Sequence, residues 1–342
     1  MGNKLAMRKA SFYWLTLLFF LLAETPPAAL RAETLRGKFQ NPINRGPDPF
    51  MVYFEGNYYL STTQGDAIRI WKAPTLAGLK TAAATTVWCD SDPSRSAGIW
   101  APEFHFFQHH WFLYYTATSR DGSDDNHRMY VVESEGTDPL GPYRFKARLF
   151  NPANDHYAID GTVFENQPDG QIYFIWAARP GHVLYIAKMA NPYTLQGNGV
   201  YIPADGFGCA AVREGPAILQ HDGKIFLVYS MCDTGTPDYK LGMLIADEKA
   251  DLLRPQSWRQ YPRPVFVRSD SANVFGPGHN GFFKSPDGKE DWIVYHAKTT
   301  SQYTYAGRTT RAQKFSWNAD GTPDFGTPLP LNTPLDEPSG EP

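Results

Sequence analysis

Acidic residues that stand beside glycine or proline recur along this sequence at nearly even intervals. Asp48, Glu103, Asp160 and Glu214 each precede an apolar stretch, and His279 takes the same place in the last such stretch. The intervals between these five positions are 55, 57, 54 and 65 residues. One such acid alone is most often a turn former. Four acids brought together would repel one another and shift their pKa values, a condition that acid–base catalysis exploits.

Hydrolysis of a glycosidic bond is one reaction that needs this combination of groups. A carboxylic acid protonates the leaving oxygen, and in inverting enzymes a second carboxylate activates water about 6.5–9.5 Å away. A third acid can raise the pKa of the proton donor and orient it. Residues more than 50 positions apart can share this chemistry only if the fold brings the repeated positions together.

Each of the five positions opens a segment with the same layout, an apolar strand, a polar turn and an aromatic-rich strand. The first segment reads DPFMVYFEGNYYLSTT, and the fourth reads EGPAILQHDGKIFLVYSM. The turns EGN, PDGQ, HDGK and PDGK predict tight hairpins, because glycine accepts the positive φ that such turns need. Both arms are rich in β-branched and aromatic residues, and long helical periodicity is absent.

A unit of about 55 residues, repeated five times in an all-β chain, predicts a five-bladed β-propeller. A β-sandwich or a β-helix would leave this interval unexplained. If the first strand of each unit is innermost, the five positions meet at one mouth of the axial channel. A further strand near residues 311–317 could complete or close the ring. We expect residues 33–342 to form this single domain.

Residues 1–32 have the composition of a secretory signal peptide, with early basic residues, an apolar run at 12–23 and small residues up to Ala32. Twelve apolar residues are too few for a comfortable membrane span, although an uncleaved anchor is the alternative. We therefore expect a secreted protein, extracellular or periplasmic, without stable membrane association. The net charge of −3 and the lack of a basic tract argue against a nucleic-acid partner.

The three cysteines, Cys89, Cys209 and Cys232, cannot all pair within one chain. No spacing among them is typical of a zinc site. A disulfide between Cys209 and Cys232 and three buried thiols are both compatible with the sequence.

Five segments together resemble glycoside hydrolase family 43. They are GPDPF, GIWAPEFH, AIDGTVFE, REGPAIL and VFGPGHNGFF, and they span nearly the whole chain after residue 32. The stretches EDWIVYHA and GTPDFG most resemble its exo-acting α-L-arabinofuranosidases, which cut α-1,5-linked arabinan. The resemblance implies a five-bladed propeller, an inverting mechanism, and arabinan or arabinoxylan of plant cell walls as substrate. β-Xylosidase or endo-arabinanase activity remains an alternative, as does a non-catalytic sugar-binding propeller.

The resemblance also implies roles for the acids. Asp48 would be the general base that activates water, Glu214 the general acid, and Asp160 the residue that tunes the pKa and orientation of the acid. Glu103 is not one of the family's three catalytic residues, and we expect it to be a pocket or structural residue.

Other residues are implied to surround the sugar. Trp100 would form part of the sugar-binding wall, and Ile159 would give an apolar contact. Arg308, with Arg311 as the nearby competitor, would contact the substrate and offset the negative charge. His279 matches a histidine near the family's propeller axis. No cofactor is required, but a structural Ca²⁺ near His279 is possible, although Ca²⁺ prefers oxygen ligands.

The histidines of the second unit have no partners that the sequence reveals. We expect His127, in the stretch SRDGSDDNH, to lie in an exposed loop that borders the pocket.

Overall fold

The computed structural model describes residues 1–2, 37–151, 153 and 155–342. The chain divides into two units, Met1–Leu35 and Arg36–Pro342. The predicted signal peptide at 1–32 therefore lies almost wholly outside the described residues. Among the described residues, no helix combines the length and the apolar composition needed to cross a membrane.

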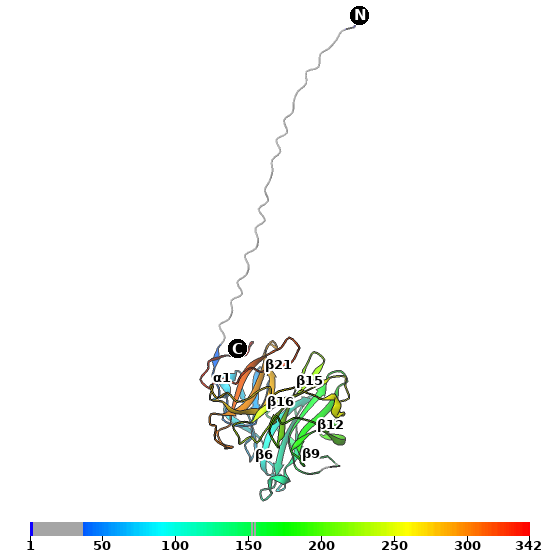
Figure 1. Cartoon of the computed structure of the whole chain (residues 1–342), viewed down its shortest axis with the longest axis vertical. Coiled ribbons are helices and arrows are strands. Elements are labelled where there is room, and N and C mark those ends of the chain that lie inside the picture. Colours follow the sequence, from blue (N-terminus) through cyan, green and yellow to red (C-terminus); the bar gives the residue numbers. More distant parts are fainter. Residues whose placement is uncertain (3–36, 152, 154) are drawn as a thin grey trace. The chain divides into compact units, whose positions relative to one another are not determined.

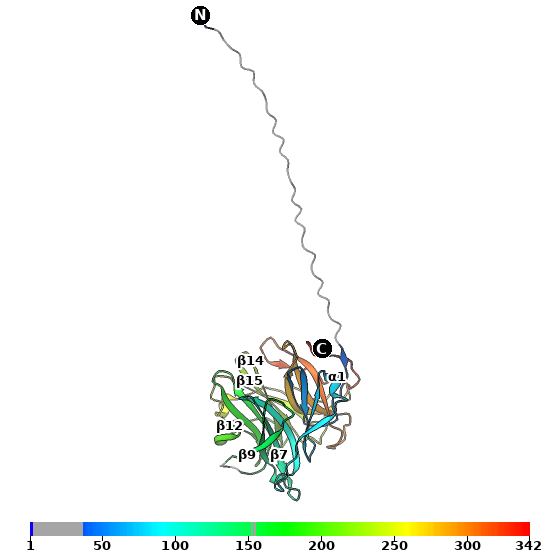
Figure 2. The ribbon, with the colours of Figure 1, turned by 180° about the vertical axis from the view of Figure 1, so that it is seen from behind.

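The unit Arg36–Pro342 is a five-bladed β-propeller, as the repeat predicts, and each blade is an antiparallel sheet of four consecutive strands (Figures 1 and 2). Blade 1 has β2 (Phe50–Phe54), β3 (Asn57–Ser61), β4 (Ile68–Ala73) and β5 (Ala84–Trp88). Blade 2 has β6 (Ala97–Phe107), β7 (His110–Thr118), β8 (Arg128–Ser134) and β9 (Tyr143–Leu149). Blade 3 has β10 (Ala158–Asn166), β11 (Gln171–Ala178), β12 (Val183–Asn191) and β13 (Thr194–Ile202). Blade 4 has β14 (Arg213–His221), β15 (Lys224–Met231), β16 (Lys240–Asp247) and β17 (Arg259–Gln260), and blade 5 has β18 (Phe275–Lys284), β19 (Asp291–Lys298), β20 (Thr309–Trp317) and β21 (Pro323–Asp324).

The first strand of every blade is the innermost one. β2, β6, β10, β14 and β18 each contact the first strands of the two adjacent blades, and β18 contacts β2, so the ring is closed. The order of strands within each sheet follows the chain, which leaves the fourth strand outermost. The starts of all five innermost strands therefore face one end of the axis.

One hydrophobic cluster fills each of the five interfaces between neighbouring blades. β11 shows how a single strand serves two interfaces, because successive side chains point to opposite faces of a sheet. Tyr173, Ile175 and Ala177 pack toward blade 4, whereas Phe174 and Trp176 pack toward blade 2.

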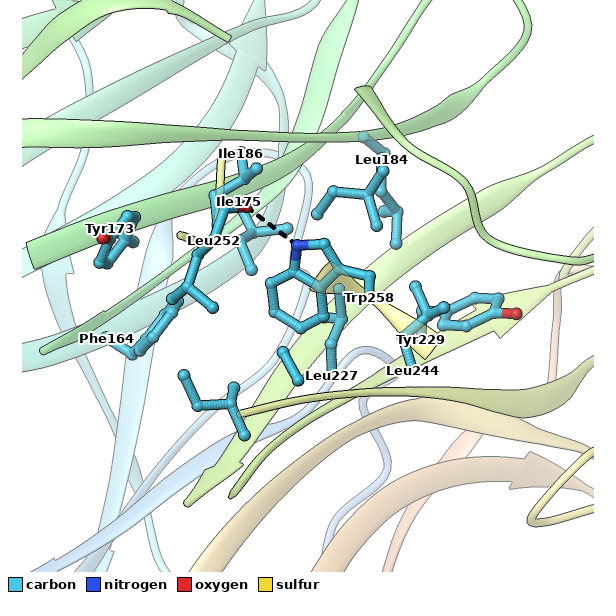
Figure 3. Close-up of a cluster of buried hydrophobic side chains, with 14 of the residues drawn as sticks. Phe164, Tyr173, Ile175, Leu184, Ile186, Leu227, Tyr229, Leu244, Leu252 and Trp258 are labelled. Carbon is cyan, nitrogen blue, oxygen red and sulfur yellow. Dashed lines mark hydrogen bonds between the residues drawn. The ribbon is translucent and has the colours of Figure 1, made fainter. Parts of the chain in front are cut away.

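The cluster between blades 3 and 4 surrounds Trp258, whose indole donates to the carbonyl of Leu252 at 3.0 Å (Figure 3). Removal of such a buried aromatic ring costs about 3–5 kcal/mol of folding free energy.

Both ends of this unit help to close the ring. β1 (Lys38–Phe39) pairs with β22 (Leu335–Asp336), beside the short helix α1 (Leu76–Leu79) in Figure 1. The side chain of Asn41 bonds the backbone of Ala312 in β20 in both directions, at 2.9 Å each. The strand expected near residues 311–317 is thus the third strand of blade 5, and the segment before blade 1 lies along it.

The hairpin turns agree with their sequences. Gly56, Gly170, Gly223 and Gly288 all have positive φ, between 65° and 80°.

The structure also decides between the two alternatives for the cysteines. Cys209 and Cys232 form a disulfide, and Cys89 is free and exposed. The alternative of three buried thiols is wrong.

Candidate active site

A cavity of about 520 Å³ opens where the innermost strands begin. This volume lies within the usual range for small-ligand pockets. Seven of the residues singled out from the sequence line it: Asp48, Trp100, Ile159, Asp160, Glu214, His279 and Arg308. The three candidate catalytic acids come from blades 1, 3 and 4, and each is less than 9 % exposed.

A backbone irregularity recurs at the cavity end of every innermost strand. At corresponding positions near the starts of these strands, each blade has a left-handed residue with φ between 41° and 54°. These left-handed positions are Asp48, Ala101, Asp160, Gly215 and His279. Non-glycine residues in this conformation cost on the order of 1–3 kcal/mol each, and such strain often marks functional sites. Here it turns three ionisable side chains toward the axis.

A hydrogen bond between neighbouring blades holds most of these positions. The acceptor is a side chain of the preceding blade, either in its second strand or just after that strand. The N–H groups of Asp48, Ala101, Asp160 and His279 donate in this way to His296, Thr63, Thr116 and Ser230, at 3.2, 2.8, 3.2 and 2.7 Å.

The junction between blades 3 and 4 differs. In blade 3 the residue that corresponds to Thr116 and Ser230 is Ala177, which pairs with Ile159. The side chain of alanine cannot accept a hydrogen bond. Instead, the N–H of Gly215 donates to Oδ2 of Asp160 at 3.1 Å. A candidate catalytic carboxylate thus replaces a structural hydroxyl and fixes the backbone next to Glu214.

Asp48 lies among cationic and hydrogen-bonding groups. Nη1 of Arg308 donates to Oδ1 of Asp48 at 3.1 Å, and Nδ1 of His279 lies 3.5 Å from the same oxygen. Burial alone would raise the pKa of Asp48, but the charges of Arg308 and His279 outweigh it and hold that pKa well below its usual range. Burial lowers the pKa of His296 to about 4, so its neutral ring can accept the Asp48 N–H.

Asp160 has the opposite protonation behaviour. Burial raises the pKa of Asp160 to about 7, and the negative charges of Glu214 and Asp48 add to this effect, while His279 opposes it from 3.8 Å. The pKa of His279 is also shifted. Burial alone would lower it, but the negative charges of Asp160, Asp48 and Glu214 raise it above its usual value.

Glu214 has two partners that the sequence did not reveal. Tyr239 donates to Oε1 at 2.9 Å, and Nε2 of His182 lies 3.0 Å from Oε2. Burial would raise the pKa of Glu214, but the contact with His182, the charge of His279 and the hydrogen bond from Tyr239 outweigh it and lower that pKa. Because Asp160 and Glu214 interact strongly, they titrate as a pair that keeps one proton up to about pH 7.

Neither partner of Glu214 occupies a repeated position. His182 lies in the turn between β11 and β12, and Tyr239 lies just before β16. The repeat was the signal that located the acids, so it could not locate these residues.

The cavity wall in blade 2 is a stacked pair of rings. Trp100 and His127 lie 3.8 Å apart between ring centroids, with 27° between their planes. The expectation that His127 is exposed is wrong, since it is 1 % exposed and its Nδ1 contacts the carbonyl oxygen of Asp124 at 2.8 Å. The indole of Trp100 shields His127, while Asp124 lines the cavity.

Glu103 is absent from the described residues that line the cavity. Its Oε2 lies 2.9 Å from Nε2 of His105. The reason is the register of β6, in which Ala101 takes the left-handed position, so that Glu103 falls two residues farther along the strand. The structure therefore favours the structural role of Glu103 over the pocket role.

Of the two candidate arginines, Arg308 reaches the cavity and Arg311 does not. Arg311 is fully buried in β20, where its Nη2 donates to the carbonyl of Ala297 at 3.3 Å.

The surroundings of His279 do not fit the expected Ca²⁺ site. Ca²⁺ takes six to eight oxygen ligands, whereas the nearest Asp48 oxygen is already bound by Arg308. Within the described part of the chain, no group of three or more His, Cys, Asp or Glu side chains could hold a metal ion. We assign no catalytic step to a metal.

Comparison with known proteins adds independent information. The model of the glycosyl hydrolases family 43 matches residues 39–323. An extracellular exo-α-(1→5)-L-arabinofuranosidase of Streptomyces avermitilis is 38 % identical over 92 % of this chain and 69 % of its own length. The enzyme of the same name from Streptomyces chartreusis is 33 % identical over 80 % of this chain and 86 % of its own.

A crystal structure of an α-L-arabinofuranosidase from Lactobacillus brevis superposes with a TM-score of 0.79 at 37 % identity, and the match covers 86 % of this chain and 98 % of that one. Together with the enclosed acids, these matches identify the protein as a glycoside hydrolase that belongs to glycosyl hydrolases family 43.

Proposed function

We propose that this protein is an exo-acting α-L-arabinofuranosidase that releases L-arabinofuranose from α-1,5-linked arabinan or its oligosaccharides with inversion. The observation that carries the proposal is the enclosure of Asp48, Asp160 and Glu214 in one cavity at one end of the propeller axis. The names of the relatives at 33–38 % identity favour this sugar and linkage.

Asp48 is suited to be the general base. The nearby cations keep its carboxylate ionised, so it can take a proton from water. The oxygen of that water forms the new bond to the anomeric carbon, and its proton passes to Asp48.

Glu214 is suited to protonate the leaving oxygen while the old glycosidic bond breaks. The proton comes from the Asp160–Glu214 pair, which holds one proton below about pH 7. Tyr239 and His182 fix the carboxyl group of Glu214, and Asp160 fixes the adjacent Gly215. Asp160 thus assists Glu214 in two ways, because the two acids share a proton and because Asp160 holds the backbone next to Glu214 in place.

The proposal also concerns where the protein acts, which is outside the cell or in the periplasm. The two Streptomyces relatives are named as extracellular enzymes, and the predicted signal peptide supports export of this chain. A plant cell-wall polysaccharide, arabinan or arabinoxylan, is then the substrate that the enzyme meets.

The test is hydrolysis of p-nitrophenyl α-L-arabinofuranoside and of linear arabinan by the wild type and by Glu214→Ala. We expect arabinose as the first product of the wild type, and a loss of roughly 10²–10⁴-fold on linear arabinan in the variant, the usual size of a general acid's contribution. Early release of longer oligosaccharides would replace the exo assignment with an endo one. Binding of arabinan without cleavage of any glycoside would refute an enzymatic role.

Nuclear magnetic resonance of the reaction mixture tests the stereochemistry. Inversion of an α-linked substrate gives β-L-arabinofuranose first, before mutarotation equilibrates the anomers. If the α anomer forms first, the enzyme retains configuration and Asp48 is not a general base acting on water.

A further inference from the structure

Two exposed tyrosines stand at the rim of the cavity. Tyr303 and Tyr305 lie in residues 299–308, between β19 and β20, and are 60 % and 53 % exposed. Tyr305 lines the cavity, and the two ring centroids are 5.6 Å apart with 73° between the planes. The pair extends the cavity wall outward with flat apolar surface, and exposed apolar surface beside a site often marks an area of contact with a ligand.

The hydroxyl groups of both tyrosines are held by one acid. Tyr303 and Tyr305 donate to Oδ1 and Oδ2 of Asp233, at 3.4 and 3.2 Å, and their own hydroxyl oxygens are 2.8 Å apart. Gly235 N–H also donates to Asp233, at 2.7 Å. The rings are therefore oriented before any ligand arrives, which lowers the entropy cost of binding.

The base of the same loop is anchored by a buried lysine. Lys298 is 0 % exposed, and its Nζ donates to the carbonyls of Gly235 and Thr304 at 2.7 and 3.0 Å. Thr304 N–H donates to the carbonyl of Gly235 at 2.8 Å. Lys298 thus joins the loop of blade 5, which carries the tyrosines, to the loop of blade 4, which carries Asp233.

The position of this pair relative to the acids indicates what part of a substrate it would meet. Glu214 pairs with Ser230 between β14 and β15 of blade 4, and Asp233, three residues after Ser230, also lines the cavity. Arg308 donates to the carbonyl of Tyr305 at 3.0 Å and to Asp48. The acid of a glycoside hydrolase faces the leaving group, so the rim next to blade 4 adjoins the leaving chain.

We propose that Tyr303 and Tyr305 form a subsite for the sugar residues on the leaving side of the cleaved bond. The ligand class is a pentose chain, whose rings present C–H faces to an aromatic ring and hydroxyl groups to its polar edge. This inference rests on the proposed function, because Glu214 defines the leaving side.

The test compares two substrates in one variant. For Tyr303→Ala, the ratio of kcat/KM for α-1,5-arabinotriose to kcat/KM for p-nitrophenyl α-L-arabinofuranoside should fall by roughly three- to tenfold, as expected for one lost aromatic contact. Tyr303→Phe should keep most of the ratio. Tyr201→Ala is the matched control, since Tyr201 is 45 % exposed on β13 beside Tyr185 and does not line the cavity.

A second variant acts without removing the ring. A Cβ at Gly235 would lie 2.8 Å from the ring of Tyr303, so Gly235→Ala should displace that ring and lower the same ratio. Thermal denaturation shows that each variant is folded. An unchanged ratio in folded Tyr303→Ala would overturn the subsite, as would an equal fall in Tyr201→Ala. A wild type that cleaves neither substrate would instead refute the proposed function.

Discussion

Asp48 and Asp160 are the same kind of side chain in two different surroundings. Both take the left-handed position of an innermost strand with φ of 54°, and they are 8 % and 7 % exposed. Nevertheless, the pKa of Asp48 lies well below the usual range, whereas that of Asp160 is raised to about 7. The difference follows from their neighbours, because Arg308 reaches Asp48 and Glu214 lies beside Asp160.

Burial alone therefore does not set the protonation state of these acids. Blade 5 supplies the cations and one side of the cavity, so a base is kept ionised there. Blades 3 and 4 place two carboxyl groups together, and His279 and His182 do not outweigh burial and the charge of Glu214 at Asp160, so a proton is retained there. One cavity thus holds a proton acceptor and a proton donor at the same pH.

Replacement of the two proposed proton-transfer groups has the largest expected effect. Asp48→Asn and Glu214→Gln should each lower kcat by roughly 10²–10⁴-fold. Their dependence on the leaving group should differ. Glu214→Gln should lose less activity on an aryl arabinofuranoside than on arabinobiose, because an acidic phenol needs little protonation. Asp48→Asn should lose the same on both, and the reverse pattern would exchange the two roles.

Removal of the cation beside Asp48 should make the two sides of the cavity more alike. In Arg308→Met the pKa of Asp48 should rise, so activity should fall as the pH is lowered through the new value and the base becomes protonated. At neutral pH we expect a loss of about ten- to a hundredfold, the size of a charged hydrogen bond. Arg308→Lys keeps a positive charge and should lose less. A pH profile of Arg308→Met that parallels the wild type would contradict this role.

The pH profile of the wild type tests the other side. Because the pKa of Asp160 is raised to about 7, the pair holds its proton below that pH and loses it above. The value of kcat/KM on arabinobiose should therefore fall by about tenfold per pH unit beyond the alkaline limb. Asp48 remains ionised across the same range and adds no acid limb. A rate that rises between pH 7 and pH 8 would contradict the shared proton.

The smallest expected effect concerns the missing acceptor at Ala177. Ala177→Ser would offer Gly215 N–H a hydroxyl, as three of the other four junctions do, and would weaken its bond to Asp160. A carboxylate that loses a donor has a higher pKa, so the alkaline limb should shift upward and kcat/KM should fall by less than about tenfold. Ala178→Ser is the matched control, because Ala178 packs toward blade 2. Equal profiles in both variants would show that the Asp160–Gly215 bond does not influence the acid pair.

The fold could be predicted because the repeat is visible in the sequence. Hairpin turns, apolar strands and even spacing of the acids identify the blades without any long-range information. The same spacing located Asp48, Asp160 and Glu214. It misplaced Glu103, because the left-handed position of blade 2 is Ala101, two residues earlier in β6, and no residue type reveals that offset.

The environment of the acids could not be predicted in the same way. His182 and Tyr239 lie in connecting segments, whose paths depend on tertiary contacts and not on periodicity. The stacking of His127 on Trp100 joins a residue of β6 to one in the segment just before β8. The sign of each pKa shift depends on distances between side chains from different blades, which a sequence pattern does not encode.

The closure of the ring between blades 5 and 1 also has a consequence in time. Hairpins of the early blades need only local sequence, but the cationic partners of Asp48 come from residues 279 and 308. A chain during synthesis therefore carries its proposed base from an early stage without the groups that keep it ionised. The order of the sequence delays hydrolytic competence until nearly the whole propeller has been made.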